Sequence, residues 1–224
     1  MTTPWRVPRE WVGETVAVLG AGPSLTREQC EYLRGRCRII AVNCSAIPTV
    51  HSVTGEHIPA MAPFADVLYA GDQKWWGRYG VQGLKFPGLK VTLRNGLKLP
   101  EVYSLAPSTR TPFDPRRTHL CTGGNSGYQA ISLAVHFGAA RIVLCGFDVK
   151  AGPNGLKHYH GNHVGSLNKP QKYDYWIRHF GQLARYLTKR VGIDVVNCTP
   201  GSALRCFRTS TLEQELPDAE SRAA

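Results

Sequence analysis

The chain has 224 residues, of which 42% are hydrophobic and 19% charged, and its formal net charge is +11. This length and composition are ordinary for a globular protein of one domain, or one domain with small additions, that buries a sizeable core. No apolar run approaches the roughly 18 residues of a membrane span, and the opening MTTPWRVPREW holds no apolar core of a signal peptide. We therefore expect a cytoplasmic protein without a membrane span.

The positive charge is concentrated in the body of the chain. The last sixteen residues, TSTLEQELPDAESRAA, hold four acids and one base, so residues 1–208 carry +14. Such a body attracts polyanions such as nucleic acid, nucleotides or an acidic glycan, although surplus lysine and arginine also simply keep a surface soluble. We expect residues 1–208 to form a single α/β domain and residues 209–224 to form an acidic, disordered tail.

The first half of the chain alternates apolar runs with turns. The run TVAVLGAG at 15–22 predicts a buried strand, and Thr26 with Gln29 three residues later fits a capping box that starts a helix. Residues 94–120 are rich in proline, arginine and turn formers and show no period, which predicts an irregular loop region or a small subdomain. Further strands are predicted at 38–45, 65–72 and 89–93.

The second half repeats the alternation more clearly. Helices are predicted at 125–138, with Gly138 as its stop, and at 172–190; strands are predicted at 141–148 and 192–200. This order predicts a doubly wound α/β fold, Rossmann-like, with a largely parallel sheet flanked by helices. In such folds the ligand binds beyond the carboxyl ends of the strands.

Small or polar residues follow each strong strand, which predicts one shared site. These residues are Gly20, Gly22, Ser24, Asn43, Asp72 and Asp148. Each has an ordinary explanation as a turn residue, but parallel strands bring all of them to one edge. The sequence GAGPSL lacks the third glycine of the dinucleotide fingerprint, and Pro23 removes an N–H group, so a phosphate or nucleotide contact is expected but not NAD. Trp75 and Trp76 would stack on a base or sugar, or pack in the core.

A second glycine cluster, TGGNSG at 122–127, precedes the predicted helix at 125–138. Exposed N–H groups at a helix start, beside the side chains of Asn125 and Ser126, suit an anionic or sugar oxygen. An ordinary N-cap supplied by either residue explains the pattern equally well.

The segment KHYHGNHVGS, residues 157–166, holds three histidines within six residues. Imidazole titrates near neutral pH and can take a proton from an attacking hydroxyl, so we expect one catalytic histidine here. A zinc site is the second interpretation, but HxHxxH has no cysteine or carboxylate partner at a familiar spacing. A solvated loop without a function is the third interpretation. The seven cysteines, odd in number and without a CxxC pair, are expected to be reduced and mostly buried.

The order of these motifs resembles a known set. VAVLGAGPSL, AVNCS, TGGNSGYQAISLAVHFGAARIVLCGFDV, HYHGNH and NCTPGSALRCF follow the order seen in single-domain bacterial sialyltransferases and in the related MptE-like and motility-accessory-factor domains. The resemblance covers about half of the chain, residues 15–45 and 121–206. Similar sequences also occur among bacteriophage reading frames, which would suit an enzyme of DNA modification.

The resemblance implies a role for individual residues. It makes His163, by a one-residue shift, or His160 the general base, and it places Asp72 near a phosphate. Asp72 and Asp148 would hold Mg²⁺ if a metal takes part. The residues implied to bind the nucleotide donor are Gly20, Gly22, Pro23, Ser24, Asn43, Gly124, Asn125, Ser126 and Gly127.

The resulting hypothesis is a transferase with a nucleotide-activated donor, most simply a glycosyltransferase that moves a sugar to a hydroxyl of a glycan or of DNA. The first alternative is an MptE-like pyrophosphokinase that uses ATP and Mg²⁺. The second is a non-catalytic nucleic-acid-binding protein on the same fold, for which the basic body of the chain is the argument.

Overall fold

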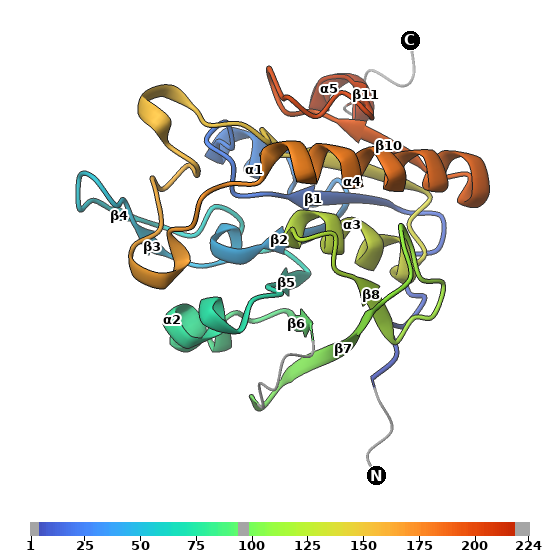
Figure 1. Ribbon diagram of the computed structural model, residues 1–224, viewed down its shortest axis with the longest axis horizontal. Helices are drawn as coiled ribbons and strands as arrows, with labels where there is room; N and C mark the ends of the chain where they lie inside the picture. Colours follow the sequence, from blue (N-terminus) through green and yellow to red (C-terminus); the bar gives the residue numbers. More distant parts are fainter. Residues whose placement is uncertain (1–4, 94–98, 218–224) are drawn as a thin grey trace.

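The computed structural model describes residues 5–93 and 99–217 (Figure 1). Within these ranges its main sheet has nine strands, and all of their pairings are parallel. The strands are β1 Thr15–Leu19, β2 Arg38–Val42, β5 Val67–Tyr69, β6 Leu89–Leu93, β7 Val102–Ser108, β8 His119–Cys121, β9 Arg141–Cys145, β10 Asp194–Asn197 and β11 Arg208–Thr209. A separate antiparallel pair joins β3 Thr49–Val50 to β4 His57–Ile58.

Helices cover both faces of this sheet, so the predicted doubly wound α/β fold is confirmed. The helices are α1 Arg27–Leu33, α2 Gln73–Leu84, α3 Ser126–Phe137, α4 Tyr173–Tyr186 and α5 Leu212–Glu215. Short helical turns lie at η1 Asn43–Ala46, η2 Pro153–Gly155, η3 Gly165–Leu167 and η4 Leu187–Val191. None of the described helices is long and apolar enough to cross a membrane.

Two hydrophobic cores lie on opposite sides of the sheet. Successive residues of a strand point to opposite faces, so Val16 and Val18 of β1 pack in the core under α3 and α4, whereas Ala17 and Leu19 pack in the core under α1, α2 and α5. A strand that is buried on both faces must be apolar throughout. The sequence of β1 is therefore a nearly continuous run of apolar residues.

The strand order creates one topological switch point. The order is β11-β10-β9-β1-β2-β5-β6-β7-β8, so the chain runs outward from β1 to β8 and then returns through α3 to β9, on the other side of β1. The crevice beyond the carboxyl ends of β1 and β9 is the place where doubly wound folds bind ligands. Figure 1 shows that α4 begins near this end of the sheet and then runs back along the face of the sheet.

The helix signals in the sequence are confirmed. Thr26 and Gln29 form the predicted capping box, in which each side chain accepts a hydrogen bond from the other's backbone N–H. Helix α3 begins after the N-cap Asn125 and ends at Gly138, whose φ of 104° is the left-handed conformation that glycine adopts without strain.

The prediction of an irregular region at 94–120 is wrong for residues 102–108 and 119–121, whereas residues 109–118 form a loop. Strands β7 and β8 extend the sheet there, and Asp114 accepts hydrogen bonds from Arg116 and Ser108 in the loop between them. The strands escaped the sequence pattern because β7 has only one buried residue, Leu105, and contains a proline. Residues 94–98 lie outside the described ranges.

The prediction of a disordered tail is wrong for residues 209–217. Leu212 and Leu216 are buried in the core under α1, and the Tyr32 hydroxyl donates a hydrogen bond to the Leu216 carbonyl at 2.8 Å. The buried Glu215 carboxylate accepts hydrogen bonds from Arg208, at 2.7 Å for one pair of atoms. Residues 218–224, which carry the remaining acids of the predicted tail, lie outside the described ranges.

We expect Glu215→Gln to lower the free energy of unfolding by about 1 kcal/mol at pH 7, because it removes a charge-assisted hydrogen-bonded pair that is half open to water. The Arg208 guanidinium lowers the pKa of Glu215 from 4.5 to about 2. The pair therefore stabilises the fold fully above pH 4.5 and loses this effect as the pH falls toward 2. Urea unfolding at pH 7 and pH 3 measures the difference, with the exposed Glu213→Gln as control. An equal loss at both pH values would contradict the account.

Candidate active site

The two turns at the switch point are in direct contact. The Gly20 N–H donates to the Cys145 carbonyl at 2.8 Å, and the Gly22 N–H donates to the Gly146 carbonyl at 3.0 Å. A Cβ at Gly20 would lie 2.4 Å from the Gly146 oxygen, and one at Gly22 would lie 2.0 Å from Asp148 Oδ2. Both glycines are thus required by the neighbouring turn. Their N–H groups are already bonded, which corrects the expectation that they cradle a phosphate.

The same contact fixes Asp148. Its Oδ2 accepts a hydrogen bond from the Ser24 hydroxyl at 2.9 Å. Burial raises the pKa of Asp148, and the bonds from Ser24 partly offset the rise. Pro23 packs against Gly152. Pro23 and Ser24 are not among the described residues that line the cavity next to this contact.

That cavity, which we call the central cavity, has a volume of about 530 Å³ and lies beyond the carboxyl ends of β1, β2 and β9. A volume of this size suits a small-molecule ligand. It brings together most of the residues singled out in the sequence. Those that line it are Gly20, Gly22, Asn43, Asp72, Gly124, Asn125, Ser126, Gly127, Asp148 and His163.

Asn43 has the most unusual environment in the central cavity. Its backbone is in the left-handed region, at φ 56°, which asparagine tolerates better than most residues. The Ser45 hydroxyl donates to the Gly20 carbonyl at 2.8 Å and so ties this turn to the end of β1. The Oδ1 atom of Asn43 is buried without a hydrogen-bond partner among the described residues. A buried acceptor without a donor is costly, and a ligand that brings an N–H or O–H group would remove the cost.

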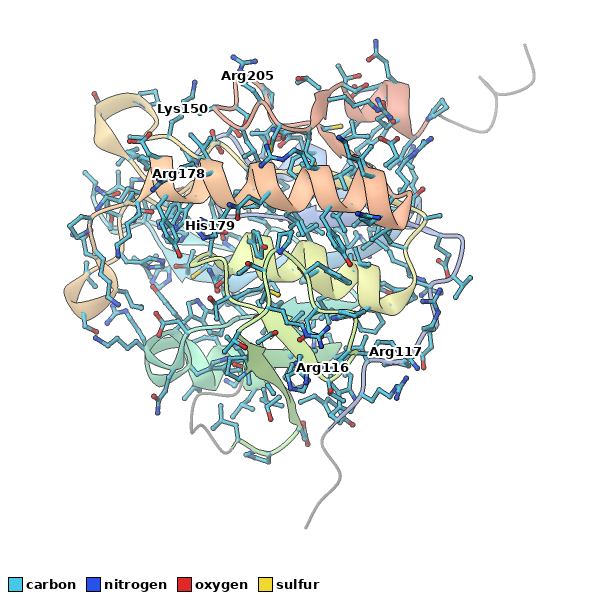
Figure 2. The ribbon with its side chains drawn as sticks, turned by 45° about the vertical axis from the view of Figure 1, so that its right-hand side comes forward. Arg116, Arg117, Lys150, Arg178, His179 and Arg205 are labelled. Carbon is cyan, nitrogen blue, oxygen red and sulfur yellow. The ribbon has the colours of Figure 1, made fainter. Side chains whose placement is uncertain are left out.

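Positive charge dominates the central cavity. Lys150, Lys157, Lys169 and Lys172 line it, against the two acids Asp72 and Asp148. Figure 2 shows Lys150, Arg178 and Arg205 around the same half of α4, so the positive charge continues on the surface beside the cavity. An anionic ligand such as a phosphate or a carboxylate fits this arrangement.

Aromatic rings supply the apolar walls. Tyr173, Tyr175 and Trp176, from the first turn of α4, line the cavity together with Phe147 and Trp75. Tyr175 lies so close to the turn before α3 that a Cβ on Gly124 would be 2.8 Å from its ring. None of Tyr173, Tyr175 and Trp176 was predicted as a site residue. Their only sequence signal is the density of aromatic residues in YDYW.

The N-terminus of α3 is capped by the protein itself. Asn125 Oδ1 accepts hydrogen bonds from the N–H groups of Gly127, at 2.8 Å, and of Tyr128, at 3.2 Å. A Cβ on Gly127 would lie 2.7 Å from the Phe147 ring, so this glycine is also set by packing. The ordinary N-cap is therefore present, and Ser126, at the first position of the helix, lines the cavity beside it.

Asp72 and the two tryptophans also have structural partners. Asp72 is the N-cap of α2, and its Oδ1 accepts a hydrogen bond from the Lys74 N–H at 2.8 Å. The buried Trp76 donates to the Ala70 carbonyl at 2.9 Å, so core packing is the alternative that holds for this residue. Trp75 is buried as well, with one edge at the cavity. Helix α2 itself was not predicted, since glycines interrupt its pattern.

The histidine loop, residues 157–166, separates the central cavity from a second one. This lateral cavity has a volume of about 670 Å³ and is lined by residues that include His51, His57, Arg78 and His160. Of the two histidines expected as general base, His163 lines both cavities and His160 lines only the lateral one. His158 was not predicted as a site residue, but it lines the central cavity, and its ring centroid lies 4.6 Å from that of His163.

Burial keeps these imidazoles neutral. Desolvation is the largest cause that lowers the pKa of His158 to about 4, of His160 to about 3 and of His163 to about 4. The positive charges of Arg78 and Lys157 lower the pKa of His163 further. At physiological pH each ring therefore has a free lone pair, while the lowered pKa also makes each ring a weaker base than an exposed imidazole.

Comparison with known proteins shows a likeness in fold but no match in sequence. No protein-family model matches the sequence, and no curated protein matches it. Among solved structures, the fold is similar to that of the sialyltransferase CstII from Campylobacter jejuni, determined in complex with a substrate analogue, cytidine-5'-monophosphate. The TM-score is 0.52 at 13% sequence identity, over 88% of this chain and 85% of that chain. The likeness is one of fold.

We expect Gly22→Ala to destabilise the protein by about 1–3 kcal/mol, because the new methyl group overlaps Asp148 and the Gly146 carbonyl. The matched control is Gly77→Ala in α2, where a Cβ meets nothing within 4 Å and alanine favours the helix. Thermal and urea unfolding compare the two variants. Equal stabilities would show that the two turns are not packed as described.

Proposed function

We propose that the protein is a glycosyltransferase that binds a nucleotide-activated sugar in the central cavity and transfers the sugar to a hydroxyl group. Asn43 carries the proposal, because it lines a cavity at the switch point of a doubly wound sheet and its buried Oδ1 has no hydrogen-bond partner among the described residues. The fold likeness to a sialyltransferase determined with cytidine-5'-monophosphate supports the same class of ligand.

The walls of the cavity suit the parts of such a donor. The lysines at 150, 169 and 172 would neutralise the phosphate that links nucleoside and sugar. The rings of Tyr175 and Trp176 would pack against the base or the sugar. Asn43 Oδ1 would accept a hydrogen bond from an amino or hydroxyl group of the donor.

We propose His163 as the general base, since it borders both cavities. An acceptor that enters from the lateral cavity would then meet the donor beside this imidazole. The acceptor hydroxyl gives its proton to His163 as its oxygen bonds to the anomeric carbon, and the bond from that carbon to the phosphate oxygen breaks. The nucleotide leaves with the bonding electron pair. A single displacement of this kind inverts the anomeric configuration.

The positive surface around α4 suits an anionic acceptor, either an acidic glycan or DNA (Figure 2). Both carboxylates considered for Mg²⁺ already accept hydrogen bonds from protein groups, Asp72 from Lys74 and Asp148 from Ser24. No feature of the described residues favours ATP as the donor, so our proposal contains no step that uses ATP or Mg²⁺.

We expect at least one of CMP, UDP, GDP and ADP to raise the thermal unfolding midpoint of the wild-type protein. Asn43→Gly preserves the left-handed backbone and deletes the amide, and it should weaken that nucleotide about tenfold, the loss of roughly one hydrogen bond. Asn154→Gly is the matched control, because Asn154 has the same φ of 56° and is exposed. If no nucleotide raises the unfolding midpoint, the proposal is rejected and the alternative of a nucleic-acid-binding protein is favoured.

We expect His163→Ala to reduce transfer, or hydrolysis, of the corresponding nucleotide sugar about 10²–10⁴-fold, because it removes the proton acceptor. Nucleotide binding should persist, as should the activity of His119→Ala, a variant in β8 that lines neither cavity. Release of free nucleotide, followed by chromatography, measures the rate. Undiminished turnover in His163→Ala would remove this residue from the mechanism.

A further inference from the structure

A cysteine and two histidines converge at the wall between the two cavities. Cys44, His160 and His163 each offer one ligand atom, and these atoms all lie within 4.8 Å of one another. Cys44 comes from the turn η1 after β2, and the histidines come from the histidine loop. Cys44 is fully buried and His160 is only 2% exposed. The fold therefore supplies the thiol partner that HxHxxH lacks in the sequence.

The cluster contains a polar atom that the protein leaves unsatisfied. The Nε2 atom of His160 is buried and has no hydrogen-bond partner among the described residues. Burial of an imidazole nitrogen without a partner costs free energy. A metal ion held between this nitrogen, the Cys44 sulfur and His163 would remove that cost.

Hydrogen bonds hold the two ligand-bearing segments together. The Tyr159 hydroxyl donates to the Cys44 carbonyl at 2.8 Å, which joins the histidine loop directly to η1. Ser52 donates through its N–H to the His160 carbonyl at 3.1 Å. Gly161 has a φ of 90°, and a Cβ there would lie 2.3 Å from Ser52 Oγ, so the loop turns tightly between its histidines. The ligands are thus preorganised before any ion arrives.

Two further side chains orient the ligands. The Trp75 indole N–H donates to Cys44 Sγ at 3.5 Å. The Tyr79 hydroxyl lies 3.4 Å from His163 Nδ1, close enough for a hydrogen bond that fixes the ring. Partners of this kind, which hydrogen-bond to the ligands themselves, are typical of metal centres in proteins.

We propose that Cys44, His160 and His163 form a binding site for Zn²⁺. One thiolate and two imidazoles are the ligands that zinc prefers, whereas Mg²⁺ and Ca²⁺ take oxygen ligands. Bond lengths of about 2.3 Å to sulfur and about 2.0 Å to nitrogen place tetrahedral ligand atoms about 3.3–3.6 Å apart, so atoms that now lie within 4.8 Å of one another move closer by up to roughly 1.5 Å on binding. The Cys44 thiol gives up its proton to solvent, and water from the lateral cavity takes the fourth position.

This site has a consequence that rests on the proposed function. A zinc ion bound to His163 occupies a ring nitrogen at the wall shared by both cavities. The ring then no longer accepts the proton of an acceptor hydroxyl. Zinc would act as a reversible inhibitor of transfer. Metal binding itself is independent of that reaction and is tested without it.

Cobalt is the probe, because Co²⁺ replaces Zn²⁺ in tetrahedral sites and its absorption spectrum reports a thiolate ligand. Titration of the metal-free, reduced protein with Co²⁺ should produce a thiolate-to-cobalt charge-transfer band that saturates at one equivalent and disappears when Zn²⁺ is added. The band should be missing in Cys44→Ser and retained in Cys198→Ser, which alters another buried thiol. No charge-transfer band in the wild-type protein, or the same band in Cys44→Ser, overturns the proposal.

A second variant covers the case in which Cys44→Ser does not fold. His160→Ala should retain the circular dichroism spectrum and weaken Co²⁺ binding at least tenfold, since it deletes one ligand. Unchanged Co²⁺ affinity in this folded variant would also overturn the proposal. The nucleotide-induced rise in the unfolding midpoint uses neither residue, so the zinc site and the proposed function can fail separately.

Discussion

The contact between the turns after β1 and β9 is the constraint on which the rest of the site depends. The carbonyl of Gly146 and the carboxylate of Asp148 occupy the space where side chains at positions 20 and 22 would begin, so only glycine fits there. This contact fills the space directly beyond the ends of β1 and β9. The remaining walls of the central cavity come from η1, the start of α3 and the first turn of α4. The glycines act by packing, and in the proposed function it is the residues around them that bind the ligand.

The sequence was sufficient for the central part of the fold. Strands buried on both faces, such as β1 and β9, must be continuously apolar. N-caps such as Thr26 and Asn125 can be recognised from the residue type alone. The edge was not predictable in this way, because β7 buries a single side chain and needs no apolar run. The order of α5 likewise depends on Arg208, which reaches Glu215 only in the folded chain.

The sequence predicted where the candidate site lies better than it predicted what each residue of the site does. Polar residues at the ends of parallel strands share one edge of the sheet. This rule predicted that Asn43, Asp72 and Asp148 lie close together, and all three line the central cavity. It did not distinguish a residue with an unpartnered polar atom from one that holds a turn: Asn43 keeps an unpartnered oxygen, whereas Asp72 caps α2. His158 and the meeting of Cys44 with His160 depend on long-range packing, and no spacing in the sequence encodes them.

A crystal structure of the protein soaked with CMP would show both whether a nucleotide binds and where it binds. The account predicts the nucleotide in the central cavity, with its phosphate beside Lys150 or Lys172 and a donor group within hydrogen-bond distance of Asn43 Oδ1. If CMP gives no density, the same crystals are tested with UDP, GDP and ADP. A nucleotide bound only outside this cavity, or none bound at saturating concentration, would contradict the account.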